Sequence, residues 1–219
     1  MLDKFLSLFL QSNCPLCQRS TGEIVCVSCQ NQLKNCQLNN PCQFWQGKLP
    51  LFVWGVYQGK LKQAIASLKY DKHLQLAELM GDWLAEAWLN TSYYKQTKKL
   101  TVIPIPLHPK KLQERGFNQA ELIARSFCNL TGYSLQAKGL ERIKETQAMF
   151  SLNSLNDREN NLRDAFVLGK GLQKFRSDSP VLLIDDIYTT GTTTNEAAKL
   201  LRSHNILVLG VGAIAIAKK

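Results

Sequence analysis

Apolar residues of this chain gather either in short unbroken runs or in stripes with helical spacing, and the two patterns alternate. The run at 181–184 is typical of a strand buried on both faces of a parallel sheet, and further strands are expected at 51–57, 101–107 and 206–216. Two prolines inside 101–107 argue against a central ladder position for that run, or indicate that the strand ends there. The helical stripes cover residues 60–89, with a break near 70–72, and residues 120–130 and 196–203. This alternation predicts an α/β fold with a parallel-sheet core and flanking helices.

The run at 181–184 is followed by two acids and a turn rich in threonine. Asp185 and Asp186 stand where we expect the strand to end, and a helix is predicted from Asn195. The turn between them holds Thr189, Thr190, Gly191, Thr192 and Thr193. Free backbone N–H groups and the helix dipole make such a turn an anion site, and glycine permits backbone angles that a side chain forbids.

Two carboxylates beside this turn would repel a bare phosphate. They suit a ligand that carries a phosphate at one end and vicinal hydroxyls at the other, because carboxylates are strong acceptors for hydroxyl groups. A 5-phosphorylated ribose is such a ligand. A solvated corner without a ligand is the alternative, but it gives no reason for the paired acids.

The stretch VLLIDDIYTTGTTT at 181–194 resembles the phosphoribosyl-pyrophosphate (PRPP) motif of type I phosphoribosyltransferases. The resemblance implies that Asp185 and Asp186 bind the ribose hydroxyls, directly or through a hydrated magnesium ion, and that residues 189–193 hold the 5-phosphate. Purine-salvage relatives carry an acid in place of Thr189, which argues against that activity, although pyrimidine-type relatives also carry threonine there. No catalytic residue is identified.

Residues 108–119, HPKKLQERGFNQ, are interpreted as a polar, basic loop. In type I phosphoribosyltransferases the loop after the first core strand binds pyrophosphate, and this resemblance yields four candidates: Lys110, Lys111, Arg115 and Gly116. A solvated basic loop is the alternative. Lys69 and Tyr70 lie at the break between two predicted helices and could face a ligand. The polar segment within residues 133–168 is interpreted as a lid, or otherwise as a surface excursion.

Two C-x-x-C pairs stand close together near the start of the chain: Cys14 with Cys17, and Cys26 with Cys29. Four thiolates on two tight turns suit a structural, tetrahedral zinc ion. Two disulfides would need an oxidising compartment, and redox activity of one pair would not explain the other. A unit this small is expected to bury little apolar surface, so that the metal supplies its folding energy.

Two further cysteines, Cys36 and Cys42, are too poorly spaced for a third pair and are interpreted as small apolar residues or spare thiols. The chain of 219 residues is expected to divide into an N-terminal helix and zinc module at 1–45 and a phosphoribosyltransferase-like domain at 46–219. Its formal net charge of +10 favours polyanionic partners, although general solubility explains it equally well. No apolar run approaches the ~20 residues that span a membrane.

Four blocks in order resemble the ComF family of competence-associated proteins: the double C-x-x-C, YQGKLKQAIASLKY, PIPLHPKKLQERGFNQAEL, and the segment from 142 to the PRPP-like motif. The resemblance implies a cytoplasmic, PRPP-binding protein that acts in uptake of transforming DNA. It leaves two activities open: phosphoribosyl transfer to an unidentified acceptor, or a silent PRPP sensor and adaptor for single-stranded DNA. A protein of the competence machinery is a further candidate partner.

Overall fold

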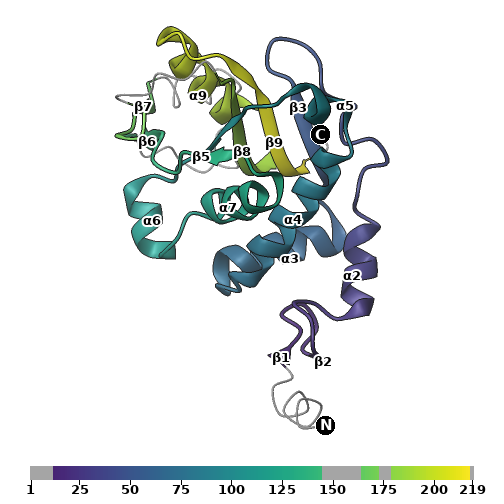
Figure 1. Cartoon of the computed structure of the whole chain (residues 1–219). Helices are drawn as coiled ribbons and strands as arrows, with labels where there is room; N and C mark the ends of the chain where they lie inside the picture. Colours follow the sequence, from purple (N-terminus) through teal and green to yellow (C-terminus); the bar gives the residue numbers. More distant parts are fainter. Residues whose placement is uncertain (1–11, 145–163, 173–178, 218–219) are drawn as a thin grey trace, which may run out of the picture.

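A five-stranded parallel sheet forms the centre of the computed structural model, which describes residues 12–144, 164–172 and 179–217. In spatial order the strands are β3 (Leu51–Val56), β9 (Val208–Ile216), β8 (Val181–Tyr188), β4 (Thr101–Pro104) and β5 (Ser134–Leu135). All neighbouring pairs run parallel. The predicted α/β architecture is confirmed (Figure 1).

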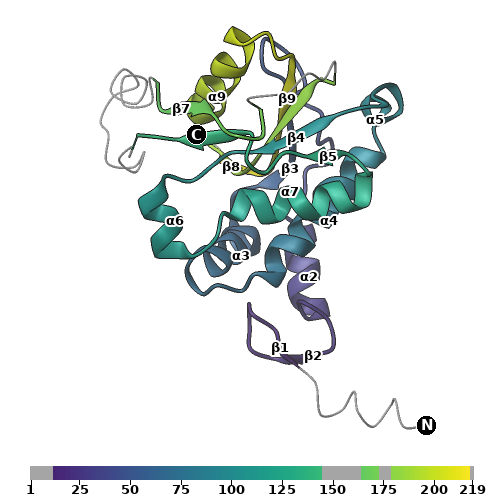
Figure 2. The same cartoon turned by 60° about the vertical axis from the view of Figure 1, so that its left-hand side comes forward.

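Helices cover both faces of this sheet. Three helices lie on one face: α3 (Gly59–Tyr70), α4 (Gln75–Leu89) and α7 (Gln119–Thr131). The other face carries α9 (Thr192–Ser203) and the antiparallel hairpin of β6 (Leu140–Arg142) and β7 (Phe166–Leu168) (Figures 1 and 2). Each face has its own apolar core: Leu182 and Ile184 of β8 pack in the first, and Val181 and Leu183 pack in the second. β8 is therefore buried on both faces, as predicted.

The first core is rich in aromatic rings between β3 and α4. Trp54 of β3 stacks on Trp83 of α4 with ring centroids 4.9 Å apart. Phe52 and Trp45 both meet the ring of Trp88 edge-on, at 5.1 and 5.3 Å. Aromatic pairs in these geometries stabilise a core beyond the area that they bury.

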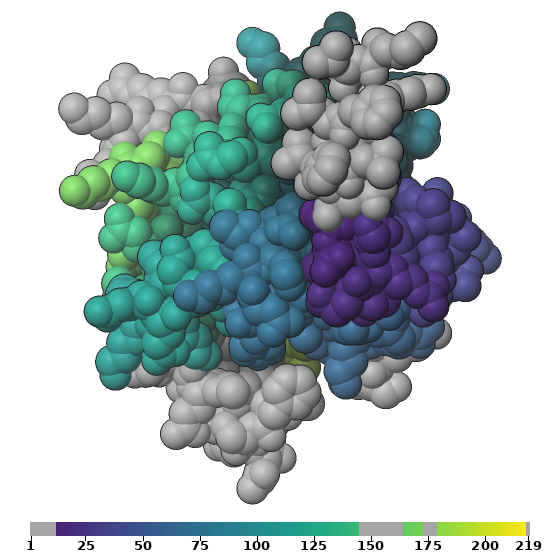
Figure 3. All heavy atoms as spheres, turned by 90° about the horizontal axis from the view of Figure 1, so that it is seen from below, coloured from purple at the N-terminus to yellow at the C-terminus, as the bar shows by residue number. Residues whose placement is uncertain are grey.

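The cysteine-rich segment begins with the small hairpin of β1 (Ser12–Asn13) and β2 (Ser20–Thr21) and ends with α2 (Val27–Lys34). It lies against α3 (Figures 1 and 3). Leu16, Val25 and Leu33 are buried and join the first core, and the Gln63 side-chain amide donates a 3.0 Å hydrogen bond to the Leu16 carbonyl. The expectation that this unit buries little apolar surface is therefore wrong, because α3 provides a surface on which it packs.

Two segments differ from their predicted structure around the PRPP-like motif. β8 does not end at Ile184 but continues through both acids to Tyr188, because β9 runs beside it and pairs as far as Ile216. The following helix begins at Thr192 rather than Asn195. Thr192 and Thr193 therefore belong to the first turn of α9.

The segment 108–119 is not a loop throughout, which corrects the sequence interpretation. It contains helix α6 (Pro109–Arg115), with proline in its first turn, where a missing N–H costs nothing. The His108 ring nitrogen accepts from the Lys110 N–H at 3.4 Å, and Gly116 ends the helix in the left-handed conformation with φ of 86°. Helical periodicity could not reveal α6 because none of its residues is buried.

The remaining described helix, α5 (Ser92–Gln96), is a short turn beyond α4. Within the described ranges, no helix is both long and apolar enough to cross a membrane. Residues 1–11, where the N-terminal helix is predicted, lie outside the described residues. Residues 145–163 of the predicted lid also lie outside the described residues.

Candidate functional site

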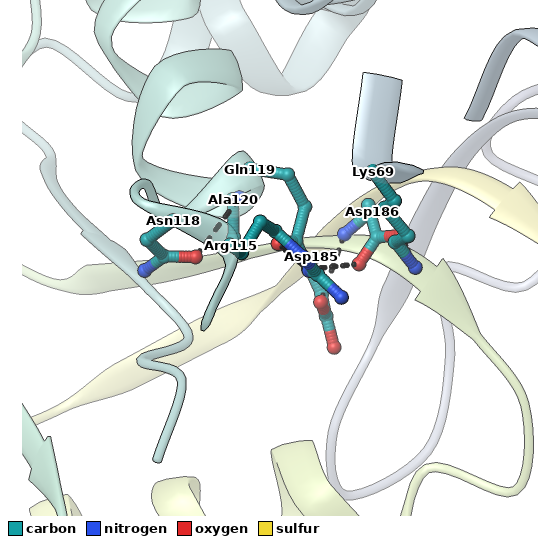
Figure 4. A network of polar contacts seen from close by, with 7 residues as sticks. All are labelled: Lys69, Arg115, Asn118, Gln119, Ala120, Asp185 and Asp186. Atoms are coloured by element: carbon teal, nitrogen blue, oxygen red, sulfur yellow. Dashed lines mark hydrogen bonds and ion pairs between the residues drawn. The ribbon is translucent and has the colours of Figure 1, made fainter. Parts of the chain in front are cut away.

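The two acids of the PRPP-like motif point to opposite faces of the sheet, because successive side chains of a strand alternate. Asp186 follows the parity of Leu182 and Ile184 and points toward α3 and α7. Asp185 follows Val181 and Leu183 toward the side of α9 and the β6–β7 hairpin. The adjacent carboxylates thus have different surroundings (Figure 4).

Asp186 is buried, with 4% of its surface exposed, and both carboxylate oxygens are engaged. Its Oδ1 accepts a 3.0 Å hydrogen bond from the side-chain amide of Gln119, at the start of α7. Its Oδ2 forms an ion pair with the ammonium group of Lys69, in the last turn of α3. The Arg115 guanidinium donates to the Oε1 of Gln119 and so joins the network (Figure 4).

Asn118 fixes the start of α7 beside this network. Its Oδ1 accepts from the Ala120 N–H at 3.1 Å, which caps the helix, and its Nδ2 donates to the Ile105 carbonyl at 3.0 Å. The segment Arg115–Gln119 thus connects the end of α6, the residue that follows β4 and the carboxylate of Asp186. Gln119 stands where its amide can reach Asp186 because Asn118 sets the first turn of the helix.

The surroundings of the two acids shift their pKa values in opposite directions. Burial opposes ionisation of Asp186, but Lys69 and then Gln119 outweigh it and hold the pKa of this carboxyl below its usual value. Burial and the neighbouring charge of Asp186 raise the pKa of Asp185 well above its usual value. Burial also opposes the charge on Lys69, yet the carboxylates raise its pKa. Asp186 and Lys69 are therefore both charged.

Asp185 is half-buried, and its Oδ1 accepts a 2.8 Å hydrogen bond from the backbone N–H of Asp186. Arg142, at the end of β6, contributes a positive charge that interacts with Asp185, while its own pKa is lowered by burial. The guanidinium of Arg142 lies 5.7 Å from the ring centre of Phe166. Arg142, which belongs to the segment predicted as a lid, therefore places its positive charge near Asp185, the more accessible of the two acids.

The turn after β8 presents the amino end of α9. Gly191 is its N-cap in the left-handed conformation, with φ of 76°, and no side chain caps the helix. The hydroxyls of Thr190 and Thr192 are 2.7 Å apart, and the Thr194 hydroxyl donates to the Gly191 carbonyl at 3.0 Å. An uncapped helix end with clustered hydroxyls has the donors that an anion needs.

Alanine at Gly191 is expected to disturb this turn. A Cβ there would lie 2.1 Å from the Tyr188 hydroxyl and 2.6 Å from the ring carbon that bears it, and the backbone would be strained. We expect Gly191→Ala to cost roughly 2–3 kcal/mol of stability and to weaken phosphate binding. Thermal denaturation and a PRPP titration measure both effects.

Gly132→Ala is the matched control, because Gly132 ends α7 with φ of 75° and an added Cβ meets nothing within 4 Å. It should lose only about 1 kcal/mol from backbone strain and keep its affinity for PRPP. Equal losses in the two variants would mean that the contact with Tyr188 has no consequence.

The structure brings only some of the predicted pyrophosphate candidates together. Arg115, at the end of α6, reaches the network around Asp186. Lys110 and Lys111 lie in the first turn of the same helix, at its far end from Arg115, and Gly116 is its cap. Sequence reasoning assigned no role to Gln119. The signal that could have found it is its place at a predicted helix start, inside the RGFNQ block.

The four cysteines of the two C-x-x-C pairs meet in one cluster. Their sulfur atoms all lie within 4.8 Å of one another, and those of Cys17 and Cys26 are 3.5 Å apart. A disulfide needs about 2.0 Å, whereas sulfurs around a tetrahedral zinc ion lie roughly 3.8 Å apart. Despite the opposing effect of burial, hydrogen bonds lower the pKa of Cys14 to about 7, whereas burial and the neighbouring thiols raise the pKa of Cys29 to about 12, so it is the geometry of the sulfurs that indicates a metal. The cluster can hold a metal such as zinc.

Cys36 and Cys42 lie outside this cluster. The Cys36 thiol is buried and contacts the backbone carbonyls of Gln32 and Gln58 at 3.6 and 3.5 Å. Cys42 is half-buried, and burial raises the pKa of its thiol. Among the described residues, no group of potential metal ligands includes either of them.

Curated relatives match almost the whole chain. It is 28% identical over 214 residues to competence protein F of Haemophilus influenzae, and the match covers 92% of this chain and 89% of the relative. It is 27% identical to competence protein ComFC of Streptococcus pneumoniae, over 87% of this chain and 74% of the relative. These relatives support the resemblance to the ComF family. The chain is also 25% identical to DNA utilization protein YhgH of Salmonella typhimurium, over 86% and 83% of the two chains. A scan of family models gave no match.

Solved phosphoribosyltransferases also resemble this chain. Adenine phosphoribosyltransferase of Leishmania donovani is 13% identical with a TM-score of 0.40, over 85% of this chain and 66% of that one. Orotate phosphoribosyltransferase of Aeropyrum pernix is 16% identical with a TM-score of 0.32, over 68% and 62% of the two chains. The chain thus spans just under two thirds of each. Its own parallel sheet with flanking helices, preceded by the four-cysteine module, is the type I phosphoribosyltransferase architecture that the sequence predicts.

Proposed function

We propose that this protein binds PRPP and acts in natural competence or DNA uptake, where it transfers a phosphoribosyl group to an acceptor. The carrying observation is the arrangement at the end of β8, where Asp185 precedes the uncapped amino end of α9. A ligand with a sugar diol at one end and a phosphate at the other would meet acceptors and donors in that order. The relatives named for competence and DNA utilization support the biological setting.

In this proposal the protein acts mainly by positioning and by charge. Backbone N–H groups and hydroxyls at 189–193 hold the 5-phosphate, and Asp185 accepts hydrogen bonds from the ribose hydroxyls. The acceptor attacks C1 while the bond from C1 to pyrophosphate breaks. The cations of α6, Lys110, Lys111 and Arg115, are the candidates that stabilise the departing diphosphate, with Gly116 allowing close approach. Magnesium is the expected companion of PRPP, and the carboxylate of Asp185 matches its preference for oxygen ligands.

Zinc is the ion that we propose for the cysteine cluster, since four thiolates form a closed structural site for it. The proposal keeps the division into a module at 1–45 and a phosphoribosyltransferase-like domain at 46–219, and it places the protein in the cytoplasm. Neither the domain division nor the cytoplasmic location depends on whether phosphoribosyl transfer occurs.

A PRPP sensor that binds single-stranded DNA is the second candidate. Its support is the net charge of +10 and the presence of Thr189 where purine-salvage enzymes have an acid that assists the base. Here PRPP binds without turnover, and DNA or a protein of the competence machinery is the partner.

One experiment separates the two. Purified protein is incubated with labelled PRPP, magnesium and a panel of bases, and pyrophosphate release and PRPP binding are measured together. Release that depends on one base supports transfer. Binding without release supports the sensor, which should also bind single-stranded DNA more weakly as salt rises. Absence of PRPP binding contradicts both.

A further inference from the structure

Lys69 belongs to none of the segments that contact PRPP in the proposed function. It lies in the last turn of α3, a helix fixed on the first core by its buried residues Leu61, Ile65 and Leu68. Its side chain is 16% exposed, and its ammonium group reaches Asp186 Oδ2. A cation that is largely buried and paired has a fixed position, because breaking the pair would leave an uncompensated charge.

Asp186 is held from two directions by this arrangement. Lys69 approaches one oxygen from α3, and Gln119 approaches the other from α7 at 3.0 Å. The amide of Gln119 is itself oriented, since its oxygen accepts from Arg115 while its nitrogen donates to Asp186. Both oxygens of the Asp186 carboxylate are therefore held in place.

Lys69 also makes the acidic pair electrostatically possible. Two adjacent carboxylates at the end of one strand repel each other, and burial strengthens that repulsion. The positive charge of Lys69 lies beside Asp186 and interacts with Asp185 as well. Asp185 can then offer its carboxylate to a ligand while Asp186 stays in place behind it.

We propose that Lys69 is a positioning residue of the ligand site, which fixes Asp186 behind Asp185 so that Asp185 can bind the ribose portion of PRPP. The inference rests on the proposed function. It differs from a direct role in binding diphosphate, for which the ammonium group would have to leave Asp186.

Calorimetric titration of Lys69→Met with three probes, each with magnesium, tests the inference. We expect the affinities for PRPP and ribose 5-phosphate to fall at least tenfold, and the affinity for pyrophosphate to change less than about twofold, because only the ribose clamp is disturbed. Lys62→Met is the matched control, as Lys62 is an exposed cation on the same helix, and it should bind all three probes like the wild type. Lys69→Gln keeps a donor for Asp186 without the charge and should fall between them, and it replaces Lys69→Met if that variant does not fold.

A second arm needs no ligand. Lys69→Met should lower Tm by more than about 5 °C, whereas Lys69→Met combined with Asp186→Asn should recover part of that loss, because the buried charge is then removed from both partners.

Three results overturn the inference while the wild type binds PRPP. They are unchanged binding in Lys69→Met, a loss of pyrophosphate affinity in place of ribose 5-phosphate affinity, or strictly additive Tm changes in the double variant. A wild type that binds no PRPP is a different outcome, since it overturns the proposed function itself and the inference with it.

Discussion

Asp186→Asn is expected to abolish PRPP binding and to destabilise the fold, whereas Asp185→Asn should abolish binding alone. The two acids are adjacent in the chain but differ in their surroundings, since Asp186 neutralises the largely buried Lys69 and Asp185 is half-buried. Asparagine at 186 leaves the ammonium group unpaired, which costs roughly 3 kcal/mol or more. For a chain of this size that is a fall in Tm of about 6–12 °C.

Thermal denaturation and PRPP titration of the two variants check this prediction. At Asp185 the loss of charge relieves repulsion with Asp186, so we expect a Tm within about 2 °C of the wild type or slightly above it. PRPP affinity should fall at least a hundredfold in both variants, roughly 3 kcal/mol. A stable Asp186→Asn protein that still binds PRPP would contradict both the ion pair and the site.

Removal of the metal from the cysteine cluster is expected to have the second large effect. Structural zinc contributes folding free energy directly, and the module it would hold is joined to the rest of the protein through Leu16, Val25 and Leu33. Loss of the ion should loosen that packing and expose part of α3. We expect a fall in Tm of at least about 10 °C on treatment with a strong chelator.

Metal analysis of the purified protein should give one zinc ion per chain, and Cys29→Ser should reduce this to well below one. Cys42→Ser is the control, since Cys42 lies outside the cluster and should keep both the zinc and the Tm. A metal-free preparation whose Tm does not respond to the chelator would show that the thiols need no ion.

The sheet and the cysteine cluster could be predicted because their signals are local. The apolar run at 181–184 reads as a strand buried on both faces whatever surrounds it, and paired C-x-x-C spacing brings thiols together on short turns. The extension of β8 to Tyr188 could not be predicted, because it depends on pairing with β9 some twenty residues further on. Helix α6 escaped prediction because it buries no residue.

The candidate site was predicted less completely for the same reason. The acids and the threonine turn are contiguous in sequence, and their chemistry can be deduced from that stretch alone. Lys69 and Gln119 come to Asp186 from two helices that are far away along the chain. The break after Tyr70 suggested only that Lys69 could face a ligand. The separation of Asp185 and Asp186 onto opposite faces follows from strand alternation, but only once β8 is known to continue past them.

The tryptophan cluster has a practical consequence for spectroscopy. The chain has four tryptophans, and Trp45, Trp54, Trp83 and Trp88 all belong to the first core, around β3 and α4. Intrinsic fluorescence will therefore report on that half of the molecule. A tyrosine, Tyr188, is the aromatic residue beside the threonine turn. Ligand binding at the turn should leave tryptophan emission nearly constant, so the same signal can follow unfolding in the presence of PRPP without correction for the bound ligand.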